Sequence, residues 1–287
     1  MPALVAVTAI WGYTFVPVQK AVALYPLFAF LAVRFAISTL ALAPFALRPL
    51  RSLPRAGVFA GVGAGCLLAT AYALQTAGLD RTTVASTGFI TGLYVVFTPL
   101  LALAAFRTPV PAPVWIGVVF ALAGLLLLSG APGGSWAGNL LVLGNAVAQS
   151  FQIVAMERWA PRYDARALTI LQMAVAFAGF AVVAVATGQV EAPPDAATWY
   201  ALVVTGVFAG ALGYLVSTWV QSRTTAARAA LVFTLEAPFA ALFGVLLLSE
   251  HLGVAGWVGC AVMLAGIVLA EPAAAATLRR LVPARAG

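Results

Sequence analysis

The sequence predicts an all-α integral membrane protein of ten transmembrane helices, arranged as two inverted five-helix repeats. Three observations lead to this fold class. Of 287 residues, 63% are hydrophobic and 8% are charged, whereas an ordinary soluble domain has about 45–50% and about 25%. Apolar stretches follow one another along the whole chain, and residues of the first half recur in the second half at a nearly constant offset. Because backbone polar groups in lipid must be satisfied within each segment, the stretches are expected to be helices.

The apolar stretches have the length of membrane spans, since a helix needs roughly 20 mostly apolar residues to cross a bilayer. Short connections separate them, so we expect one membrane domain over residues 1–287 and no soluble domain. The first stretch has no basic leader and no small-residue cleavage site, and it is expected to be retained. The expected spans are 3–24, 27–47, 56–78, 83–106, 112–130, 136–157, 167–187, 198–221, 226–248 and 254–271.

Basic residues are distributed unevenly between the two sides of this topology. With the N-terminus inside, only Lys20 and Arg81 fall on the outer side, and Arg34 lies within the second span, where we expect it to bond helix-end carbonyls or to snorkel. Because basic loops stay in the cytoplasm, both termini are predicted to be cytoplasmic. The cytoplasmic set comprises Arg48, Arg51, Arg55, Arg107, Arg158, Arg162, Arg166, Arg223, Arg228, Arg279, Arg280 and Arg285.

The two halves of the chain, residues 1–135 and 136–287, repeat one another. Each half has an odd number of spans, so the second half must lie upside down relative to the first. This is an architecture of secondary transporters, whose substrate site lies near the midplane between the repeats. At an offset of 142, Tyr72, Arg81, Thr82, Thr83, Trp115, Gly117, Ala123 and Gly124 recur as Tyr214, Arg223, Thr224, Thr225, Trp257, Gly259, Ala265 and Gly266. Earlier in the halves the offset is about 138, which places Lys20 against Arg158 and Arg34 against Gln172.

Little in the sequence suggests an enzyme. Cys66 and Cys260 lie inside apolar spans without metal-ligand spacing, His251 is the single histidine, and no HExxH, GxSxG or paired-carboxylate pattern occurs. We therefore expect no catalytic residue, no metal and no cofactor, and ATP is not expected as a direct energy source because nothing resembles a phosphate-binding loop. The net charge of +7 is spread between spans, which speaks against a nucleic-acid partner.

Polar side chains share one face in each of three spans, and lipid would not accept such faces. Hydrogen bonding between helices and a water-filled cavity both explain them. We expect Asn145, Gln149 and Gln152 to line a central cavity with Trp11, Tyr72 and Tyr94. The three stripes comprise Asn145, Gln149 and Gln152; Thr87, Thr91, Tyr94 and Thr98; and Tyr214, Ser217, Thr218 and Gln221.

Aromatic residues and prolines complete the candidate site. Trp11, Phe15, Tyr72 and Phe233 are candidates for a pocket wall on which a planar substrate stacks, with plain packing as the alternative. Pro17, Pro99 and Pro238 each remove a backbone N–H within a span and are hinge candidates, although bends without motion are equally consistent with them.

Glu236 is a carboxylate in the middle of the expected ninth span. An isolated anion there is costly, so this side chain should be protonated, paired or reached by water. One interpretation is that it bonds neighbouring helices. The other is that it contacts a substrate amino group or exchanges a proton during transport.

Several stretches, in this order and spacing, resemble the bacterial ten-helix EamA family of exporters in the drug/metabolite transporter superfamily. Thr108 departs from the pattern, because the equivalent position in the second half is Glu250. The stretches are Ile10-Trp11-Gly12 with Phe15 and Lys20; Arg34-Phe35; Gly88-Phe89-Ile90-Thr91-Gly92-Leu93 with Pro99; and Leu235-Glu236-Ala237-Pro238-Phe239-Ala240-Ala241-Leu242 through Ser249-Glu250, followed by Trp257, Gly259 and Ala265-Gly266.

The resemblance implies a secondary transporter that exports amino acids, aromatic ones among them, or related metabolites across the bacterial inner membrane. Exporters of aromatic amino acids and paraquat are the nearest comparison. Efflux of drugs and organic cations is the alternative within transport, and a membrane scaffold or sensor is the alternative outside it. The implied partners are a small-molecule substrate and membrane lipid, and protons stay open as a coupling ion.

Overall fold

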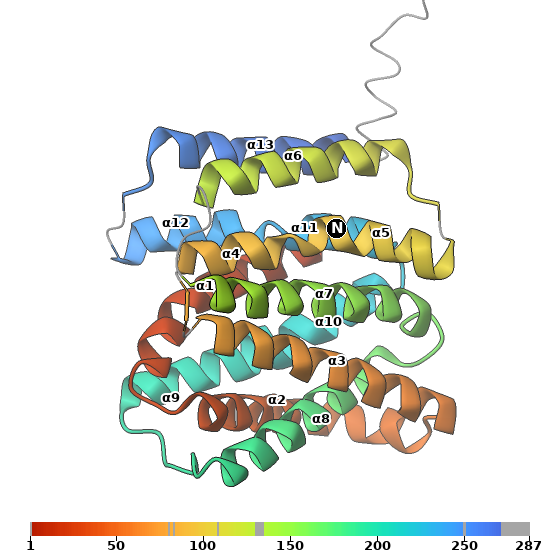
Figure 1. Ribbon diagram of the computed structural model, residues 1–287. Coiled ribbons are helices and arrows are strands. Elements are labelled where there is room, and N and C mark those ends of the chain that lie inside the picture. The colour runs from red at the N-terminus through yellow and green to blue at the C-terminus, as the bar shows by residue number, and fades with distance from the viewer. Residues whose placement is uncertain are drawn as a thin grey trace, which may run out of the picture.

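The computed structural model describes residues 2–79, 81–82, 84–107, 109–129, 135–248 and 251–270. All regular elements in this part of the chain are helices, and they lie roughly parallel to one another (Figure 1). Eight are long and apolar enough to cross a membrane, and residues 112–128 and 254–270 form two shorter apolar helices. The predicted ten-helix, all-α membrane fold is therefore confirmed.

The first half contains five helical spans, and the fourth of them is interrupted. Each span lies within a few residues of the range expected from hydropathy. The elements are α1 (Pro2–Val22), α2 (Leu27–Arg51), α3 (Arg55–Leu79), α4 (Val84–Gly92) with α5 (Tyr94–Phe106), and α6 (Ala112–Ser129).

The second half has the same order, with interruptions in its third and fourth spans. The elements are α7 (Trp136–Trp159), α8 (Ala165–Ala186), α9 (Ala196–Val203) continued by the π-helix η1 (Val204–Gly213) and by α10 (Tyr214–Gln221), α11 (Ala226–Phe233) with α12 (Glu236–Leu248), and α13 (Val254–Ala270).

Capping residues in the sequence explain where four helices of the second half begin. The side chains of Ser135, Asp164, Asp195 and Thr225 accept backbone N–H groups in the first turns of α7, α8, α9 and α11. Such caps satisfy N–H groups that have no partner within the helix. At Asp164, which lies in a connection, hydrogen bonds from Arg166 hold the pKa of the carboxyl below its ordinary value.

The packing of α6 against α13 reveals how the halves are related. These helices are equivalent at the offset of 142, and they lie side by side (Figure 1). A Cβ on Gly117 would lie 3.0 Å from the Gly266 carbonyl oxygen, and one on Gly124 would lie 2.6 Å from that of Gly259. Residue numbers that increase along α6 thus meet residue numbers that decrease along α13. The two equivalent helices run antiparallel, as inverted repeats require.

A second pair of contacts fixes the equivalence of α1 and α7. A Cβ on Gly12 would lie 2.9 Å from the carbonyl oxygen of Glu236, and the Ser150 hydroxyl donates to the carbonyl of Tyr94 at 3.5 Å. Glu236 and Tyr94 are equivalent at the offset of 142, so Gly12 and Ser150 are equivalent at 138. By the same offset, Trp11 of α1 corresponds to Gln149 of α7.

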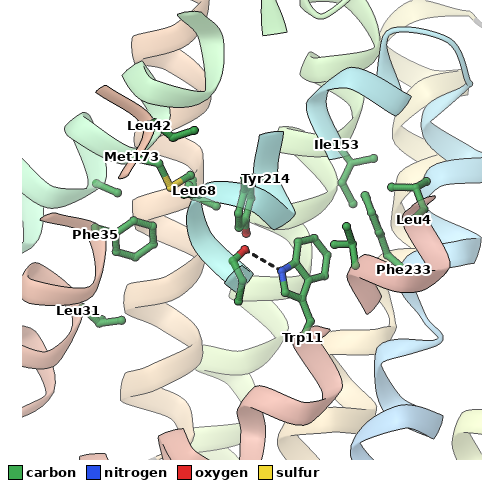
Figure 2. Packing of buried hydrophobic residues seen from close by; sticks show 14 of the residues in the cluster. Leu4, Trp11, Leu31, Phe35, Leu42, Leu68, Ile153, Met173, Tyr214 and Phe233 are labelled. Atoms are coloured by element: carbon green, nitrogen blue, oxygen red, sulfur yellow. Dashed lines mark hydrogen bonds between the residues drawn. The ribbon is translucent and has the colours of Figure 1, made fainter. Parts of the chain in front are cut away.

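The largest core cluster lies where the two halves meet, and part of it is drawn in Figure 2. Large apolar side chains such as Phe59, Trp136 and Val254 are instead exposed on the outside, as expected where a protein faces lipid. Nine of the twelve arginines that predict the orientation belong to the described chain. Three of them, Arg279, Arg280 and Arg285, lie outside it, as do Thr83, Thr108, Ser249 and Glu250. The orientation and the division at residue 135 stay predictions.

Candidate functional site

A cavity of about 480 Å³ lies between the two halves, within the range of roughly 300–1,000 Å³ that is usual for small-molecule sites. Helices α1, α2, α3, α4, α6, α7, α10, α11 and α12 contribute to its walls, as does Tyr94 of α5. The cavity brings together nine of the ten candidate residues from the sequence. They are Trp11, Phe15, Tyr72, Tyr94, Asn145, Gln149, Tyr214, Phe233 and Glu236.

Gln152 is the candidate that the structure does not bring to the cavity. Its amide Nε2 donates to Oε1 of Gln172 at 2.8 Å, and both side chains are buried. Gln172 in turn donates to the carbonyl of Leu168 at 3.3 Å. Gln152 shares a helix face with Asn145, but it lies two turns further along α7, where Gln172 of α8 meets that face. Hydrogen bonding between helices therefore explains this position.

Thr91 gathers amide groups from two helices on one wall of the cavity. Its hydroxyl oxygen accepts from Asn145 Nδ2 of α7 at 3.1 Å and from Gln75 Nε2 of α3 at 3.3 Å. Both bonds use the amide nitrogens, so the amide oxygens stay available as acceptors. Gln75 was not a candidate from the sequence. Its spacing from Tyr72 and Thr76 on α3, which also line the cavity, is the signal that could have found it.

Aromatic rings close one end of the cavity. The indole N–H of Trp11 donates to the carbonyl of Ala209 at 3.0 Å, and the Trp11 ring lies 5.4 Å from the rings of both Tyr214 and Phe233 (Figure 2). Ala209 belongs to the π-helix η1, in which backbone hydrogen bonding is locally widened. A Cβ on Gly213 would lie 2.9 Å from the indole nitrogen, so glycine leaves room for the ring.

The fourth and ninth spans are interrupted at equivalent positions beside the cavity. The break between α4 and α5 falls at Leu93, and the break between α11 and α12 falls at Thr234 and Leu235. Consequently Tyr94 and Glu236, which are equivalent, each begin a half-helix and each line the cavity. Discontinuous helices in corresponding places of two repeats are a feature of transporter binding sites.

Only one of the three candidate prolines coincides with a break. Pro238 has no N–H to offer the carbonyl of Thr234, which instead accepts from Ala237 at 3.2 Å. Pro17 and Pro99 lie within the continuous helices α1 and α5. In the fourth span the break precedes Pro99 by six residues, so proline does not mark it.

Glu236 occupies the first turn of α12, where the free N–H groups of a helix favour negative charge. Its side chain is half-buried and lines the cavity. The one ion pair within the described residues is the surface pair of Arg166 and Asp164, so Glu236 has no partner of that kind there. Its place in the cavity wall is where water could reach this carboxylate, and whether it is protonated stays a prediction.

Arg34 does not snorkel and does not bond helix-end carbonyls, contrary to the expectation from the sequence. Its side chain is 6% exposed and lines the cavity. One amino group donates to the Tyr72 hydroxyl at 3.3 Å, and the guanidinium lies 5.0 Å from the centre of the Tyr72 ring and 5.7 Å from that of Phe35. Helices α8 and η1 cover this part of α2, which keeps Arg34 from the surface.

Two inverted halves around a central cavity, with broken helices at the site, define a membrane transporter fold. The EamA-like transporter family matches residues 1–130 and again residues 136–270, once in each half. The chain belongs to this family and is a multi-pass membrane transporter.

Relatives agree with this assignment. An uncharacterized transporter of Archaeoglobus fulgidus is 30% identical over 269 residues, which cover 93% of this chain and 83% of the relative. A protein of known crystal structure, 19% identical, superposes with a TM-score of 0.80 over 97% of each chain and shares the fold.

Proposed function

We propose that this transporter exports amino acids, including aromatic ones, or closely related metabolites across the bacterial inner membrane by alternating access. The observation that carries the proposal is the composition of the cavity. Glu236 presents a carboxylate at the start of a broken helix, and Trp11, Phe15 and Phe233 supply an aromatic wall close by. A carboxylate suits an ammonium group, and an aromatic wall suits an apolar or aromatic side chain.

The shape of the cavity supports transport by alternating access. Val22, Leu79 and Leu128 line it at the C-terminal ends of α1, α3 and α6, with His251 beside them. In the orientation expected from the basic residues, with both termini cytoplasmic, these ends lie on the outer side. The opposite end is occupied by the packed rings of Trp11, Tyr214 and Phe233. An exporter releases its substrate from an outward-open form of this kind.

Efflux of organic cations is the second candidate, because the same carboxylate and rings would also attract a cation. A scaffold or sensor without transport is the candidate of another class. Protons are a further expected partner, since the Glu236 carboxylate could exchange one during the cycle. The substrate set decides between these functions, because an amino acid exporter requires a carboxylate on its substrate and a cation exporter does not.

Counterflow in proteoliposomes tests the proposal. Purified protein is reconstituted with a radiolabelled panel of amino acids, sugars, nucleosides and organic cations. We expect exchange of amino acids, and a lower rate with Glu236→Gln. Exchange of organic cations alone would replace the proposed substrate class, and no exchange of any solute would contradict transport. A reporter fused after Gly287 that localises outside would contradict the orientation.

A further inference from the structure

The guanidinium of Arg34 is buried with few of its hydrogen bonds satisfied. A guanidinium has five N–H donors, yet the one hydrogen bond that the described chain gives it is the contact with Tyr72 at 3.3 Å. Its Nε is inaccessible to solvent and has no partner. Buried charges are costly unless paired and hydrogen-bonded. The side chain is therefore poised for an anionic group that does not belong to the described protein.

The position of Arg34 directs it to the cavity. Phe30, Leu31 and Arg34 are the α2 residues in the cavity wall, and the rings of Tyr72 and Phe35 hold the guanidinium from the side. Arginine binds carboxylates well because its planar fork matches their two oxygens. The contacts with these two rings restrict the directions in which the guanidinium can point.

Tyr72 adds a second donor at the same place. Its hydroxyl oxygen accepts from Arg34 at 3.3 Å and from the Tyr214 hydroxyl at 3.4 Å. Because both bonds use its lone pairs, the proton of the Tyr72 hydroxyl remains for another acceptor. Arg34 and Tyr72 thus offer an anion a positive charge and a neutral donor side by side.

Glu236 does not neutralise Arg34 directly. Both side chains line the same cavity, but they form no ion pair within 4.0 Å. The cavity therefore presents a cation and an anion at separate places. A zwitterion is the small molecule whose charges match that arrangement.

The two halves differ at this point. Gln172 is equivalent to Arg34 in the repeat, and it is bonded to Gln152 away from the cavity. The second half thus supplies the carboxylate, Glu236, and the first half supplies the guanidinium. The asymmetry gives a site between the halves a direction along which a zwitterion can lie.

We propose that Arg34, with the hydroxyl of Tyr72, binds the carboxylate of the transported amino acid, while Glu236 faces its ammonium group. This inference rests on the proposed function and identifies the residue that separates amino acids from organic cations. Substrates without a carboxylate gain nothing from Arg34. Loss of the guanidinium therefore relaxes the requirement for a carboxylate and leaves recognition of the ammonium group and the side chain intact.

The test compares L-phenylalanine with phenethylamine, which has the same ring and ammonium group without the carboxylate. Both are measured as inhibitors of labelled L-phenylalanine counterflow by wild type, Arg34→Gln, Arg34→Lys and the control Arg48→Gln. Arg48 lies on the same helix, is exposed and is remote from the cavity lining. In Arg34→Gln we expect the apparent affinity for phenylalanine to fall about tenfold to a hundredfold, as for loss of a charge-assisted hydrogen bond, with phenethylamine changed less than about threefold.

Arg34→Lys keeps the charge without the fork, so it should fall between wild type and Arg34→Gln, and Arg48→Gln should match wild type. An equal loss for both ligands, or no loss for phenylalanine, would overturn the inference. If Arg34→Gln does not fold, the comparison is made with Arg34→Lys and Tyr72→Phe, which must also weaken phenylalanine selectively. A wild type that exchanges no amino acid would refute the proposed function itself, which is a different result from an active wild type with unchanged variants.

Discussion

The half-helices α4 and α11 are equivalent in the two repeats, but their surroundings differ. Helix α11 packs against α5, α7 and α1, and its residues Ala229 and Ala230 are fully buried. The equivalent residues of α4 are Thr87 and Gly88, which line the cavity. A Cβ on Gly88 would meet nothing within 4 Å. Helix α4 packs on α7 and α6 and contacts α12 only slightly, and the cavity lies between it and α1.

This difference shows which parts of the molecule close each end. One end is sealed because α11 packs closely on α5 and α7, and the other is hollow because α4 contacts α12 only slightly and does not pack on α1. Inverted repeats can exchange these two arrangements, so in the opposite state α4 should pack on α1 and α12 while α11 moves away. Gly88 would then lie in a close helix–helix contact like the one that Ala230 makes now.

The largest expected effect comes from filling the space at Gly88. Gly88→Leu should fold normally, because the present state has room for the side chain, but it should obstruct closure of α4. An overpacked contact costs about 1–3 kcal/mol, so counterflow should slow by roughly fivefold to a hundredfold. Substrate affinity for the present form should change little.

Gly179→Leu is the matched control, because Gly179 also has nothing within 4 Å of a built Cβ and is exposed away from the cavity. Counterflow at the wild-type rate in Gly88→Leu would show that α4 does not close in this way.

The reverse change is expected at Ala230. Ala230→Leu overpacks a fully buried position and should displace α11, which opens the sealed end. A cysteine introduced at Val7, in a background without Cys66 and Cys260, reports on this end because Val7 is 2% exposed. We expect its labelling by a water-soluble thiol reagent to rise about fivefold or more, as an overpacking cost of about 1–3 kcal/mol implies. Unchanged labelling, with a folded variant, would place the seal elsewhere.

A smaller effect should distinguish the prolines. Pro238→Ala restores a backbone N–H that can donate to the Thr234 carbonyl, so α11 and α12 should be joined more rigidly. We expect slower counterflow and a free energy of unfolding that is higher by up to about 3 kcal/mol. Pro99→Ala lies within continuous α5 and should slow counterflow less. Equal effects of the two variants would show that the break at Thr234 has no special part in the motion.

The smallest expected effect is at the start of α11. The Thr225 hydroxyl accepts the N–H of Arg228 at 3.4 Å, and loss of such a cap costs about 1 kcal/mol. Thr225→Ala should therefore loosen α11 slightly and shift the balance toward opening of the sealed end. The loss of stability is measured by thermal unfolding in detergent, with Thr187→Ala at the end of α8 as the comparison variant. Identical melting for the two variants would show that the cap has little weight.

The sequence predicted the spans and most of the cavity because both depend on regular patterns. Hydropathy located each helix within a few residues, and the offset of 142 identified Tyr94 and Glu236 as partners before either was placed at a helix break. Polar spacing indicated a face of α7, but it could not show that Gln172 of α8 bonds Gln152. Which side chain a neighbouring helix covers depends on packing between segments far apart in the sequence.

The features that sequence reasoning missed have the same origin. Arg34 was expected at helix-end carbonyls, since an intramembrane cation alone gives no hint of the aromatic rings that hold it. The break at Leu93 and the π-helix η1 have no proline to signal them. Glycines lie at both places, because Gly92 precedes Leu93 and Gly213 ends η1 beside Trp11.

Paired cysteine labelling at Gly88 and Ala230 tests the exchange between α4 and α11 most directly, because the two positions are equivalent in the repeats and only Gly88 lines the cavity with free space around it. Gly88→Cys and Ala230→Cys are made separately, without Cys66 and Cys260, and labelled with impermeant reagents from each side in vesicles during L-phenylalanine exchange. We expect Gly88→Cys to react from the outer side, Ala230→Cys to react from the cytoplasmic side, and substrate to change the two reactivities in opposite directions. Persistent protection of Ala230→Cys while the vesicles exchange substrate would contradict the account.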